Sequence, residues 1–218
     1  HIINMASFVT TRPRIIAVEG NIGAGKSTLL EEMKQKYAER TDIVFLQEPV
    51  GAWTKINQDG KNMIELFYHD QKKYSFAFQI MAYTTRLRMI EAAVREAEEK
   101  GVKVIVMERS LDADRNIFAK MLYDQGDMEP CMFQIYENMS EEGLTRYMAD
   151  GILWVNTPPE ECEKRIKSRG REGEHGIHFD YLVKCDQYHR EWLGADTGFV
   201  YIVDDEREWD SLETYLYP

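Results

Sequence analysis

Five short, mostly apolar segments recur along this chain, and longer stretches with helical spacing separate them. Residues 102–107 are almost continuously apolar, which is typical of a strand that is covered on both faces. Strands that alternate with helices indicate a parallel sheet with helices on both faces. The predicted strands are Arg14–Val18, Ile43–Gln47, Val102–Met107, Ile152–Asn156 and Val200–Val203. We therefore predict an α/β fold with a five-stranded parallel sheet.

The longest helical pattern lies between Asn62 and Lys100. Its apolar positions advance by three or four residues and form a single stripe, which we expect to be core. The stripe consists of Phe76, Ile80, Tyr83, Leu87, Ile90 and Val94. Gln79, Ala82 and Arg86 share a neighbouring face. A polar face of this kind is commonly just solvated, and the spacing alone leaves that interpretation open.

A second helix is predicted after Thr157, with Thr157 as its N-cap, proline at the first helical position and Glu160 completing a capping box. Three arginines follow on this segment: Arg165, Arg169 and Arg171. The next residues, 170–176, are rich in glycine and charge, so we predict a mobile, arginine-rich lid there.

Composition indicates a single domain. The chain has 218 residues, 44% of them hydrophobic, and we assign residues 14–218 to one domain after an N-terminal segment, 1–13. We interpret the four residues before Met5 as a cloning remnant and give them no role. A net charge of −11 disfavours binding to a nucleic-acid polymer or an anionic membrane.

The cysteines and the apolar runs indicate a cytoplasmic protein. Cys131, Cys162 and Cys185 are odd in number and widely spaced, so they indicate reduced thiols rather than a disulfide framework or a zinc site. No apolar run approaches the roughly 18 residues of a membrane span, and the N-terminus lacks a signal-peptide core.

The stretch Gly20–Ser27 matches the phosphate-binding loop pattern and directly follows the apolar run Ile15–Val18. In such a loop the backbone N–H groups surround a polyphosphate, Lys26 reaches the β- and γ-phosphates, and the Ser27 hydroxyl can hold Mg²⁺. The alternative is a glycine-rich helix start that binds nothing. The preceding strand and the following helix favour binding of ATP or GTP.

Two acids stand where strands of the predicted sheet end. Glu48 follows the second strand and Glu108 closes the third. Functional groups in such sheets gather at the carboxyl ends of the strands, so we predict that these acids supply a base and a ligand for the metal, directly or through water. Arg109 can pair with Glu48 or bridge it to the transferred phosphate.

The arginines of the lid segment add the cations that phosphoryl transfer requires. Arg165, Arg169 and Arg171 can close over the γ-phosphate as a clamp. The alternative, solvated charges on a surface helix, stays open at this point.

These motifs together resemble those of the cellular deoxynucleoside kinases, in register from residue 14 to about 205. The matching segments are 18–28 around the glycine loop, Glu48-Pro49-Val50 with Trp53, Phe78-Gln79, Glu108-Arg109-Ser110, and Arg165 through Arg171. The resemblance implies a P-loop kinase fold and a homodimer. It also implies transfer of the γ-phosphate of ATP, with Mg²⁺, to the 5′-hydroxyl of a deoxynucleoside in nucleotide salvage.

The resemblance also assigns roles to single residues. Glu48 would be the general base, Arg109 its partner, and Lys26 the third catalytic group. Donor-binding residues would be Gly20, Asn21, Ile22, Gly23, Ala24, Gly25, Lys26, Ser27, Thr28, Arg165, Arg169, Arg171, Asp205 and Glu206. Substrate-binding residues would be Trp53, Tyr68, Phe78, Gln79, Ala82, Arg86, Arg109, Asp114, Phe118 and Glu174, with Tyr181 near the sugar. Ser27 and Glu108 would hold the metal.

Within that family, substrate preference is associated with the positions of Ala82, Arg86 and Asp114. This trio resembles the cytidine- and purine-preferring members. Asp114 accepts a hydrogen bond from an exocyclic amine but would face a carbonyl oxygen on thymine, and Arg86 fills the space of a 5-methyl group. We therefore predict deoxycytidine or purine deoxynucleosides over thymidine. Gly23 stands where several relatives carry alanine, an exchange that we expect to be harmless.

Two other functions remain as alternatives. A nucleoside monophosphate kinase, such as thymidylate kinase, needs a cation near the acceptor phosphate, whereas Glu48 would repel that phosphate. A GTPase-type switch uses an Asn-Lys-x-Asp guanine reader, and here the third strand instead ends in Glu108-Arg109-Ser110.

Overall fold

The five-stranded sheet of this protein is parallel throughout, and its strands lie in the order β2-β5-β1-β6-β7. The structure is a computed structural model, which describes residues 12–194, 199–203 and 208–218. The strands are β1 (Arg14–Glu19), β2 (Ile43–Leu46), β5 (Val104–Glu108), β6 (Gly151–Val155) and β7 (Val200–Val203). All five predicted strands are confirmed to within two residues at each end. Because β1 is central, the loop that follows it emerges in the middle of the carboxyl edge.

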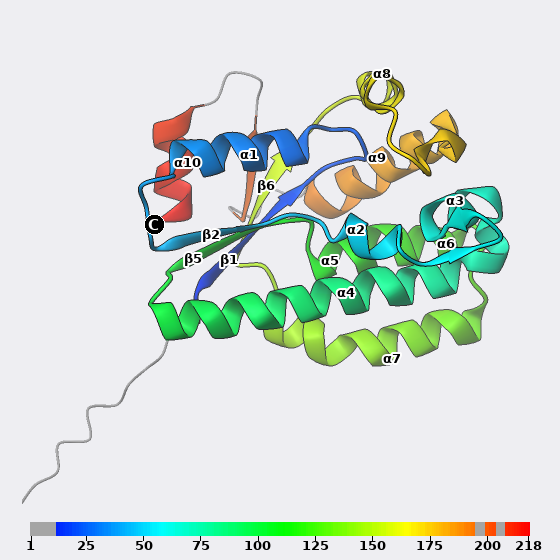
Figure 1. Cartoon of the computed structure of the whole chain (residues 1–218), viewed down its shortest axis with the longest axis horizontal. Coiled ribbons are helices and arrows are strands. Elements are labelled where there is room, and N and C mark those ends of the chain that lie inside the picture. Colours follow the sequence, from blue (N-terminus) through cyan, green and yellow to red (C-terminus); the bar gives the residue numbers. More distant parts are fainter. Residues whose placement is uncertain (1–11, 195–198, 204–207) are drawn as a thin grey trace, which may run out of the picture.

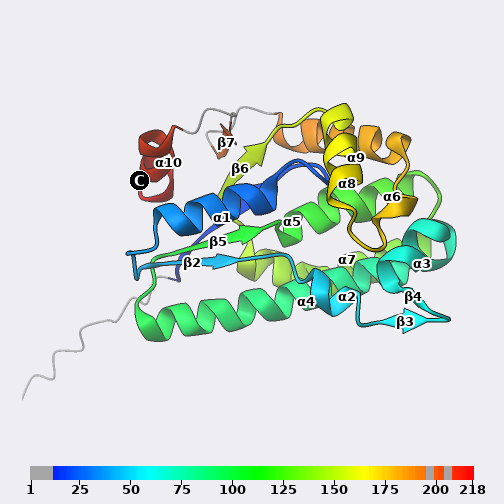
Figure 2. The same cartoon turned by 45° about the horizontal axis from the view of Figure 1, so that its top comes forward.

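Helices cover both faces of the sheet, as predicted (Figures 1 and 2). Their bounds are α1 (Lys26–Lys36), α2 (Val50–Trp53), α3 (Met63–His69), α4 (Gln71–Lys100), α5 (Leu111–Ala113), α6 (Lys120–Asp124), α7 (Pro130–Tyr147), α8 (Pro159–Arg169), α9 (Phe179–Leu193) and α10 (Trp209–Leu216). A π-helical turn, η1 (Asp114–Ala119), a 3₁₀ turn, η2 (Glu174–Gly176), and a small hairpin of β3 (Asn57–Gln58) and β4 (Lys61–Asn62) complete the described elements. None of the helices within these ranges has both the length and the apolar character that a bilayer crossing requires.

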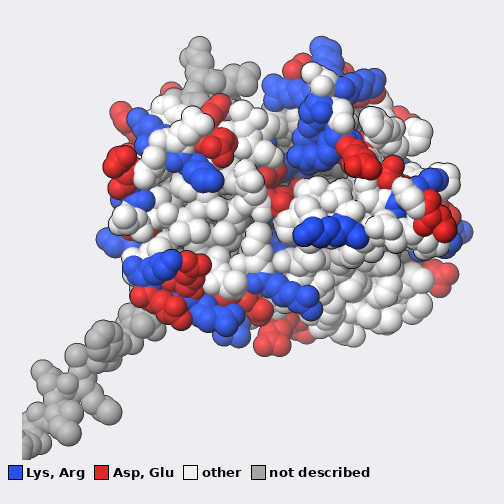
Figure 3. Space-filling model, in the orientation of Figure 1, with Lys and Arg blue, Asp and Glu red and all other residues white. Residues whose placement is uncertain are grey.

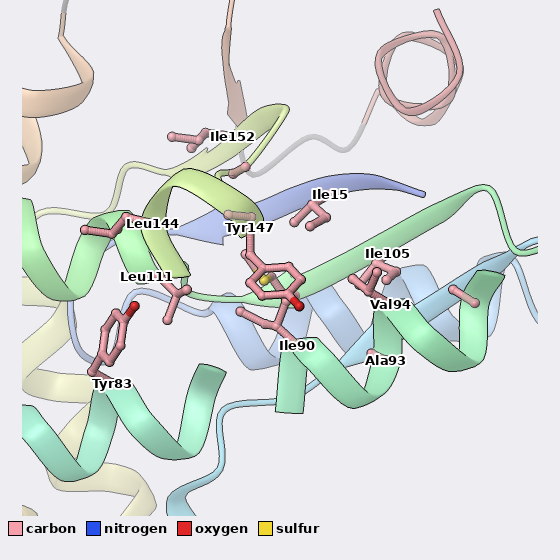
Figure 4. Packing of buried hydrophobic residues seen from close by; sticks show 14 of the residues in the cluster. Ile15, Tyr83, Ile90, Ala93, Val94, Ile105, Leu111, Leu144, Tyr147 and Ile152 are labelled. Atoms are coloured by element: carbon pink, nitrogen blue, oxygen red, sulfur yellow. The ribbon is translucent and has the colours of Figure 1, made fainter. Parts of the chain in front are cut away.

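Two hydrophobic clusters fill the space on either side of the sheet. On one side, side chains of β1, β5 and β6 pack against α4 and α7, where Tyr83, Ile90 and Leu144 are buried (Figure 4). On the other side, alternate residues of the same strands pack against α1, α8 and α10. The apolar stripe predicted for the long helix is thereby confirmed as core.

The helical pattern between residues 62 and 100 is broken once, between α3 and α4. Asp70 leaves helical geometry, with φ −147° and ψ 82°, and its carboxylate accepts a hydrogen bond from the backbone N–H of Lys73 at 3.1 Å. Asn62 and Glu65 form a capping box at the start of α3. The break lets α3 turn away from the axis of α4 and pack against η2.

The predicted capping box at Thr157 is wrong. The N-cap of α8 is Pro158, without a side-chain cap, and Pro159 is the first helical residue. The Thr157 hydroxyl instead donates to the carbonyl oxygen of Ala24 at 2.8 Å. A tertiary contact with the glycine loop therefore replaces the local cap.

Candidate active site

The glycine loop between β1 and α1 has the conformation that phosphate binding requires. Gly23 (φ +78°) and Gly25 (φ +103°) lie in the left-handed region, which residues with side chains rarely adopt. Lys26 is only 5% exposed, and its Nζ donates to the carbonyl oxygen of Asn21 at 2.8 Å. Burial lowers the pKa of Lys26 to about 8, and the charge of Arg109 acts in the same direction. The loop is therefore preformed around a buried cation.

A cavity of about 750 Å³ opens in front of this loop. Of the predicted donor-binding residues, it is lined by Ile22, Gly23, Gly25, Lys26, Ser27, Thr28, Arg165, Arg169 and Arg171. Ala24 lines an adjoining cavity beside α8, and Gly20 and Asn21 are buried at the start of the loop. Asp205 and Glu206, which were also predicted to bind the donor, lie outside the described residues.

The two predicted metal ligands adjoin each other in this cavity. The Ser27 hydroxyl donates to Oε1 of Glu108 at 2.8 Å. Mg²⁺ in kinases keeps several waters and phosphate oxygens, so a hydroxyl and a carboxylate on one side suit it. No group of three or more His, Cys, Asp or Glu in the described part of the chain could hold a metal by itself.

Glu48 lies between two arginines at the boundary of the donor cavity and a second cavity. Its Oε1 accepts from Arg86 at 2.9 Å and lies 3.3 Å from Nε of Arg109. Burial opposes ionisation of Glu48, but the charges of Arg109, Arg86 and Lys26 outweigh it and lower the pKa of Glu48 to about 2. The carboxylate is therefore ionised throughout the neutral pH range.

Arg109 connects this carboxylate to the glycine loop. One of its terminal nitrogens donates to the carbonyl oxygen of Gly20 at 3.2 Å, and the guanidinium lies 4.5 Å from the centre of the Phe118 ring. Its backbone has φ +66°, an unusual conformation for a residue with a side chain. The predicted pairing of Arg109 with Glu48 is confirmed.

The second cavity has about 590 Å³ of space, including the part that is open to solvent, and six aromatic side chains line it. All ten predicted substrate-binding residues line it, and so does Tyr181. Phe67 stacks on Phe78 with ring centres 4.4 Å apart, and Trp53 meets Phe78 edge-on at 5.7 Å. A cavity with these aromatic walls suits a flat, ring-containing ligand.

One wall of this cavity is the face of α4 that carries Gln79, Ala82 and Arg86. These residues are 2%, 3% and 0% exposed, so the alternative of a solvated face is wrong. Arg86 Nε donates to the Asp114 carboxylate at 2.9 Å, which neutralises the buried guanidinium. The side-chain oxygen of Gln79 is buried and has no hydrogen-bond partner among the described residues, so it is free to accept one from a ligand.

The three arginines of the predicted lid line the donor cavity, and Arg171 also lines the second cavity. Arg165 donates to the carbonyl oxygen of Ala24 at 2.9 Å, which attaches α8 to the glycine loop. Arg169 pairs with Glu174 at 2.6 Å, and Arg171 lies 3.4 Å from the same carboxylate. Lys and Arg side chains gather over α8, beside a hollow in the surface (Figure 3).

Glu19 and Phe67 are among the residues beside the cavities that were not predicted from the sequence. Glu19 is fully buried at the end of β1, and its Oε1 accepts hydrogen bonds from the N–H and the hydroxyl of Ser110. Phe67 contributes an aromatic face from α3. A carboxylate that directly continues an apolar strand was a usable signal for Glu19; the position of Phe67 depends on the break after α3.

Comparison with known proteins identifies the family. A family model described as deoxynucleoside kinase matches residues 16–214. The chain belongs to the deoxynucleoside kinase family. It is 33% identical to deoxycytidine kinase of Rattus norvegicus over 88% of this chain and 81% of that protein. It is also 33% identical to a probable deoxycytidine kinase of Fowlpox virus (strain NVSL), over 93% and 86% of the two chains, and 30% identical to a mitochondrial deoxyguanosine kinase of Xenopus laevis, over 89% and 78%.

Membership makes this chain an enzyme of nucleotide salvage, a kinase that phosphorylates a deoxynucleoside with a nucleotide as phosphate donor. The resemblance in the motifs and the P-loop kinase fold are confirmed. The family match decides against the two alternatives, a nucleoside monophosphate kinase and a GTPase-type switch.

The structure corrects the expectation that alanine in place of Gly23 is harmless. A Cβ atom on Gly23 would lie 2.6 Å from the carbonyl oxygen of Cys162 and 2.9 Å from the Ile166 side chain. In this chain α8 packs too closely on the loop to leave room for a methyl group.

Proposed function

We propose that this deoxynucleoside kinase transfers the γ-phosphate of ATP to the 5′-hydroxyl of deoxycytidine or a purine deoxynucleoside, in preference to thymidine. The observation that carries the proposal is the Arg86–Asp114 pair in the wall of the aromatic cavity, at 2.9 Å and with both side chains almost fully buried. The relatives named deoxycytidine and deoxyguanosine kinase support the same preference.

Glu48 is the proposed general base. It is ionised at neutral pH and stands where the aromatic cavity meets the donor cavity, so a 5′-hydroxyl that enters from the aromatic side can give its proton to this carboxylate as the bond to phosphorus forms. Arg109 and Arg86 hold the carboxylate in place. The second oxygen of Glu48 remains for the substrate.

Lys26 and the backbone N–H groups of the glycine loop are proposed to hold the β- and γ-phosphates. The positive charge of Lys26 and the partial positive charges of the N–H groups offset the negative charge that spreads over the transferred phosphoryl group. Arg165, Arg169 and Arg171 line the same cavity and are proposed to close around that group. Ser27 and Glu108 would hold Mg²⁺, which supplies further charge stabilisation when bound.

The aromatic cavity is proposed to read both parts of the nucleoside. Gln79 has a free buried oxygen and an amide N–H₂ on one rigid group, which can meet the pairing edge of a base. Asp114 can accept from an exocyclic amine, and Phe118, Phe78 and Trp53 enclose a planar ring. Tyr68 and Glu174 line the end nearer the lid and would contact the sugar 3′-hydroxyl, with Tyr181 beside them.

The experiment that tests this proposal is a coupled ADP-release assay with MgATP and four deoxynucleosides. We expect a higher kcat/KM with deoxycytidine, deoxyadenosine or deoxyguanosine than with thymidine. Thymidine as the best substrate would refute the preference. Replacing ATP by other triphosphates and Mg²⁺ by EDTA tests the donor and the metal in the same assay.

A double variant tests the residues behind the preference. Arg86→Met with Asp114→Ala removes both partners of the buried pair. Glu48 loses one of its two arginines but keeps Arg109, so kcat/KM should fall with every substrate, and the ratio between substrates is the readout. We expect the ratio of kcat/KM for thymidine over deoxycytidine to rise by at least about tenfold, because one site contact is worth about that much. The matched control is Arg115→Met with Glu137→Ala, a surface pair at 3.1 Å, which should leave the ratio unchanged.

We also propose that the enzyme is a homodimer in the cytoplasm. The resemblance in the motifs implies the dimer, and we propose that the second copy covers Ile135 on α7 and Met148 just after it, which are 54% and 55% exposed. The three free thiols suit a reducing compartment. Sedimentation velocity should show a dimer that Ile135→Glu dissociates, and fractionation of cells should recover the enzyme with the cytosol; a monomer or an organellar location would contradict these points.

A further inference from the structure

Glu19 is a buried acid that lines neither cavity. It is the last residue of β1 and is 0% exposed. Its Oε1 accepts two hydrogen bonds from Ser110, from the N–H at 2.7 Å and from the hydroxyl at 2.6 Å. The Ser110 hydroxyl in turn caps α5 by accepting from the N–H of Ala113 at 3.1 Å. The carboxylate therefore ties the end of β1 to the residues that follow β5.

Arg109 stands between these attachment points. Its own N–H donates to the carbonyl oxygen of Val18 at 3.0 Å, and the next N–H, that of Ser110, donates to Glu19. The backbone of Arg109 between them has φ +66°. Such a conformation costs energy and persists only where the surrounding structure holds it. The end of β1 supplies both of these hydrogen bonds.

The second oxygen of Glu19 faces the Arg109 guanidinium from the buried side. Oε2 lies 3.8 Å from NH1 of Arg109, and neither atom has a hydrogen-bond partner among the described residues. On the cavity side, Nε of the same guanidinium is 3.3 Å from Glu48. The guanidinium is thus held between two carboxyl groups, of which only that of Glu48 lines the substrate cavity.

We propose that Glu19 is a positioning residue, which holds Arg109 in its left-handed turn and keeps its guanidinium between Glu48 and the glycine loop. The inference rests on the proposed function, in which Arg109 and Glu48 act in phosphoryl transfer. Glu19 contributes to phosphoryl transfer by positioning Arg109, without touching either substrate. Burial raises its pKa to about 7 against the opposing charge of Arg109, so the structure retains this acid at an energetic cost.

The first test is Glu19→Gln. The amide has the same shape, and its oxygen can still accept from Ser110, but its N–H₂ would meet NH1 of Arg109 donor to donor. We expect kcat to fall by at least about tenfold while the KM for deoxynucleoside changes by less than about threefold, because Arg109 is needed mainly in the transition state. The control is Asp112→Asn, a largely buried acid on α5 that lines neither cavity, with kcat unchanged.

A double-mutant cycle separates positioning from a general structural role. If Glu19 acts through Arg109, then Glu19→Gln added to Arg109→Gln should change kcat by less than about threefold, because the two effects are not independent. Equal losses in both backgrounds would overturn the inference, and so would a Glu19→Gln enzyme with wild-type kcat. Thermal unfolding with and without ATP checks that each variant is folded and binds its donor.

If Glu19→Gln does not fold, Glu19→Asp serves instead. The shorter carboxylate keeps the charge but withdraws from Ser110, so we expect lower kcat with little change in KM, and wild-type kcat would overturn the inference. A wild-type enzyme that phosphorylates no deoxynucleoside would overturn the proposed function and this inference together. An active wild type with an unaffected Glu19 variant overturns the inference alone.

Discussion

At the scale of single residues, two buried arginines of the site each contact two acids. Arg86 contacts both Glu48 and Asp114, and Arg109 contacts Glu48 while facing Glu19. Each arginine is almost fully buried, so removal of one acid leaves a cation without full compensation. This sharing keeps Glu48 ionised and fixed in orientation, which suits a group that must receive a proton in one geometry.

Glu48→Gln is the prediction that belongs to this scale. The amide keeps the shape of the side chain but cannot take the proton, so we expect kcat to fall by about 10²- to 10⁴-fold. Affinity for deoxynucleoside should stay within a few-fold, because the aromatic walls are untouched. Steady-state kinetics and calorimetric titration measure the two quantities. Glu39→Gln, at an exposed position, is the control, and undiminished turnover in Glu48→Gln would exclude Glu48 as the base.

At the scale of elements, the glycine loop and α8 form one packed unit. Thr157 and Arg165 both donate to the carbonyl oxygen of Ala24, and Gly23 lies against the backbone of Cys162. The segment predicted to form a lid continues directly from the end of α8 at Gly170. The positions of the glycine loop and of Arg165 on α8 are therefore coupled through these contacts.

Gly23→Ala tests this packing. The added methyl group would sit 2.6 Å from the carbonyl oxygen of Cys162, in a backbone conformation with φ +78°. We expect a loss of about 1–3 kcal/mol in the free energy of unfolding, together with a higher KM for ATP. Urea denaturation and initial-rate kinetics provide the measurements.

The control for that variant is Gly51→Ala. Nothing lies within 4 Å of the position that its Cβ would take, and the residue is exposed on α2. We expect the free energy of unfolding and the KM for ATP to stay near their wild-type values. If Gly23→Ala and Gly51→Ala had the same free energy of unfolding and the same KM for ATP, α8 would not pack tightly on the loop in solution.

At the scale of the whole molecule, the sheet brings charges from distant parts of the chain to one edge. The carboxyl ends of β1, β2 and β5 carry Glu19, Glu48 and Glu108, and the glycine loop adds Lys26 (Figure 1). Burying these groups costs stability, which the two hydrophobic clusters on the faces of the sheet offset. The packing of the hydrophobic clusters therefore keeps the protein folded, although the buried charges of the active site lower its stability.

The pH dependence of stability tests this view. Burial raises the pKa of Glu19 from 4.5 to about 7, so the folded state binds a proton that the unfolded state has released between these values. The contribution of Glu19 to stability therefore falls as pH rises from 4.5 to 7, by on the order of 3 kcal/mol. Glutamine does not titrate. Glu19→Gln should thus gain stability relative to wild type across this range in urea denaturation, and a pH-independent difference would contradict the burial of an ionised Glu19.

Much of the fold was predictable because its signals are local. The strands are apolar runs, and the glycine loop is a fixed spacing of residues whose backbone must adopt positive φ. Glu48, Glu108 and Arg109 could be predicted to lie together because they stand at or just after the ends of strands, and in a parallel sheet these ends meet at one edge. These features need no knowledge of what packs against them.

Other features required partners far away in the chain. Thr157 caps no helix because its hydroxyl meets Ala24, 133 residues earlier. The face of α4 around Arg86 is a buried wall rather than a solvated one because Glu48 and Asp114 come from other elements to neutralise it. The sequence by itself determined the strands, the loop and the family; only the tertiary structure decided which charges are buried, since burial depends on the neighbours that the fold brings together.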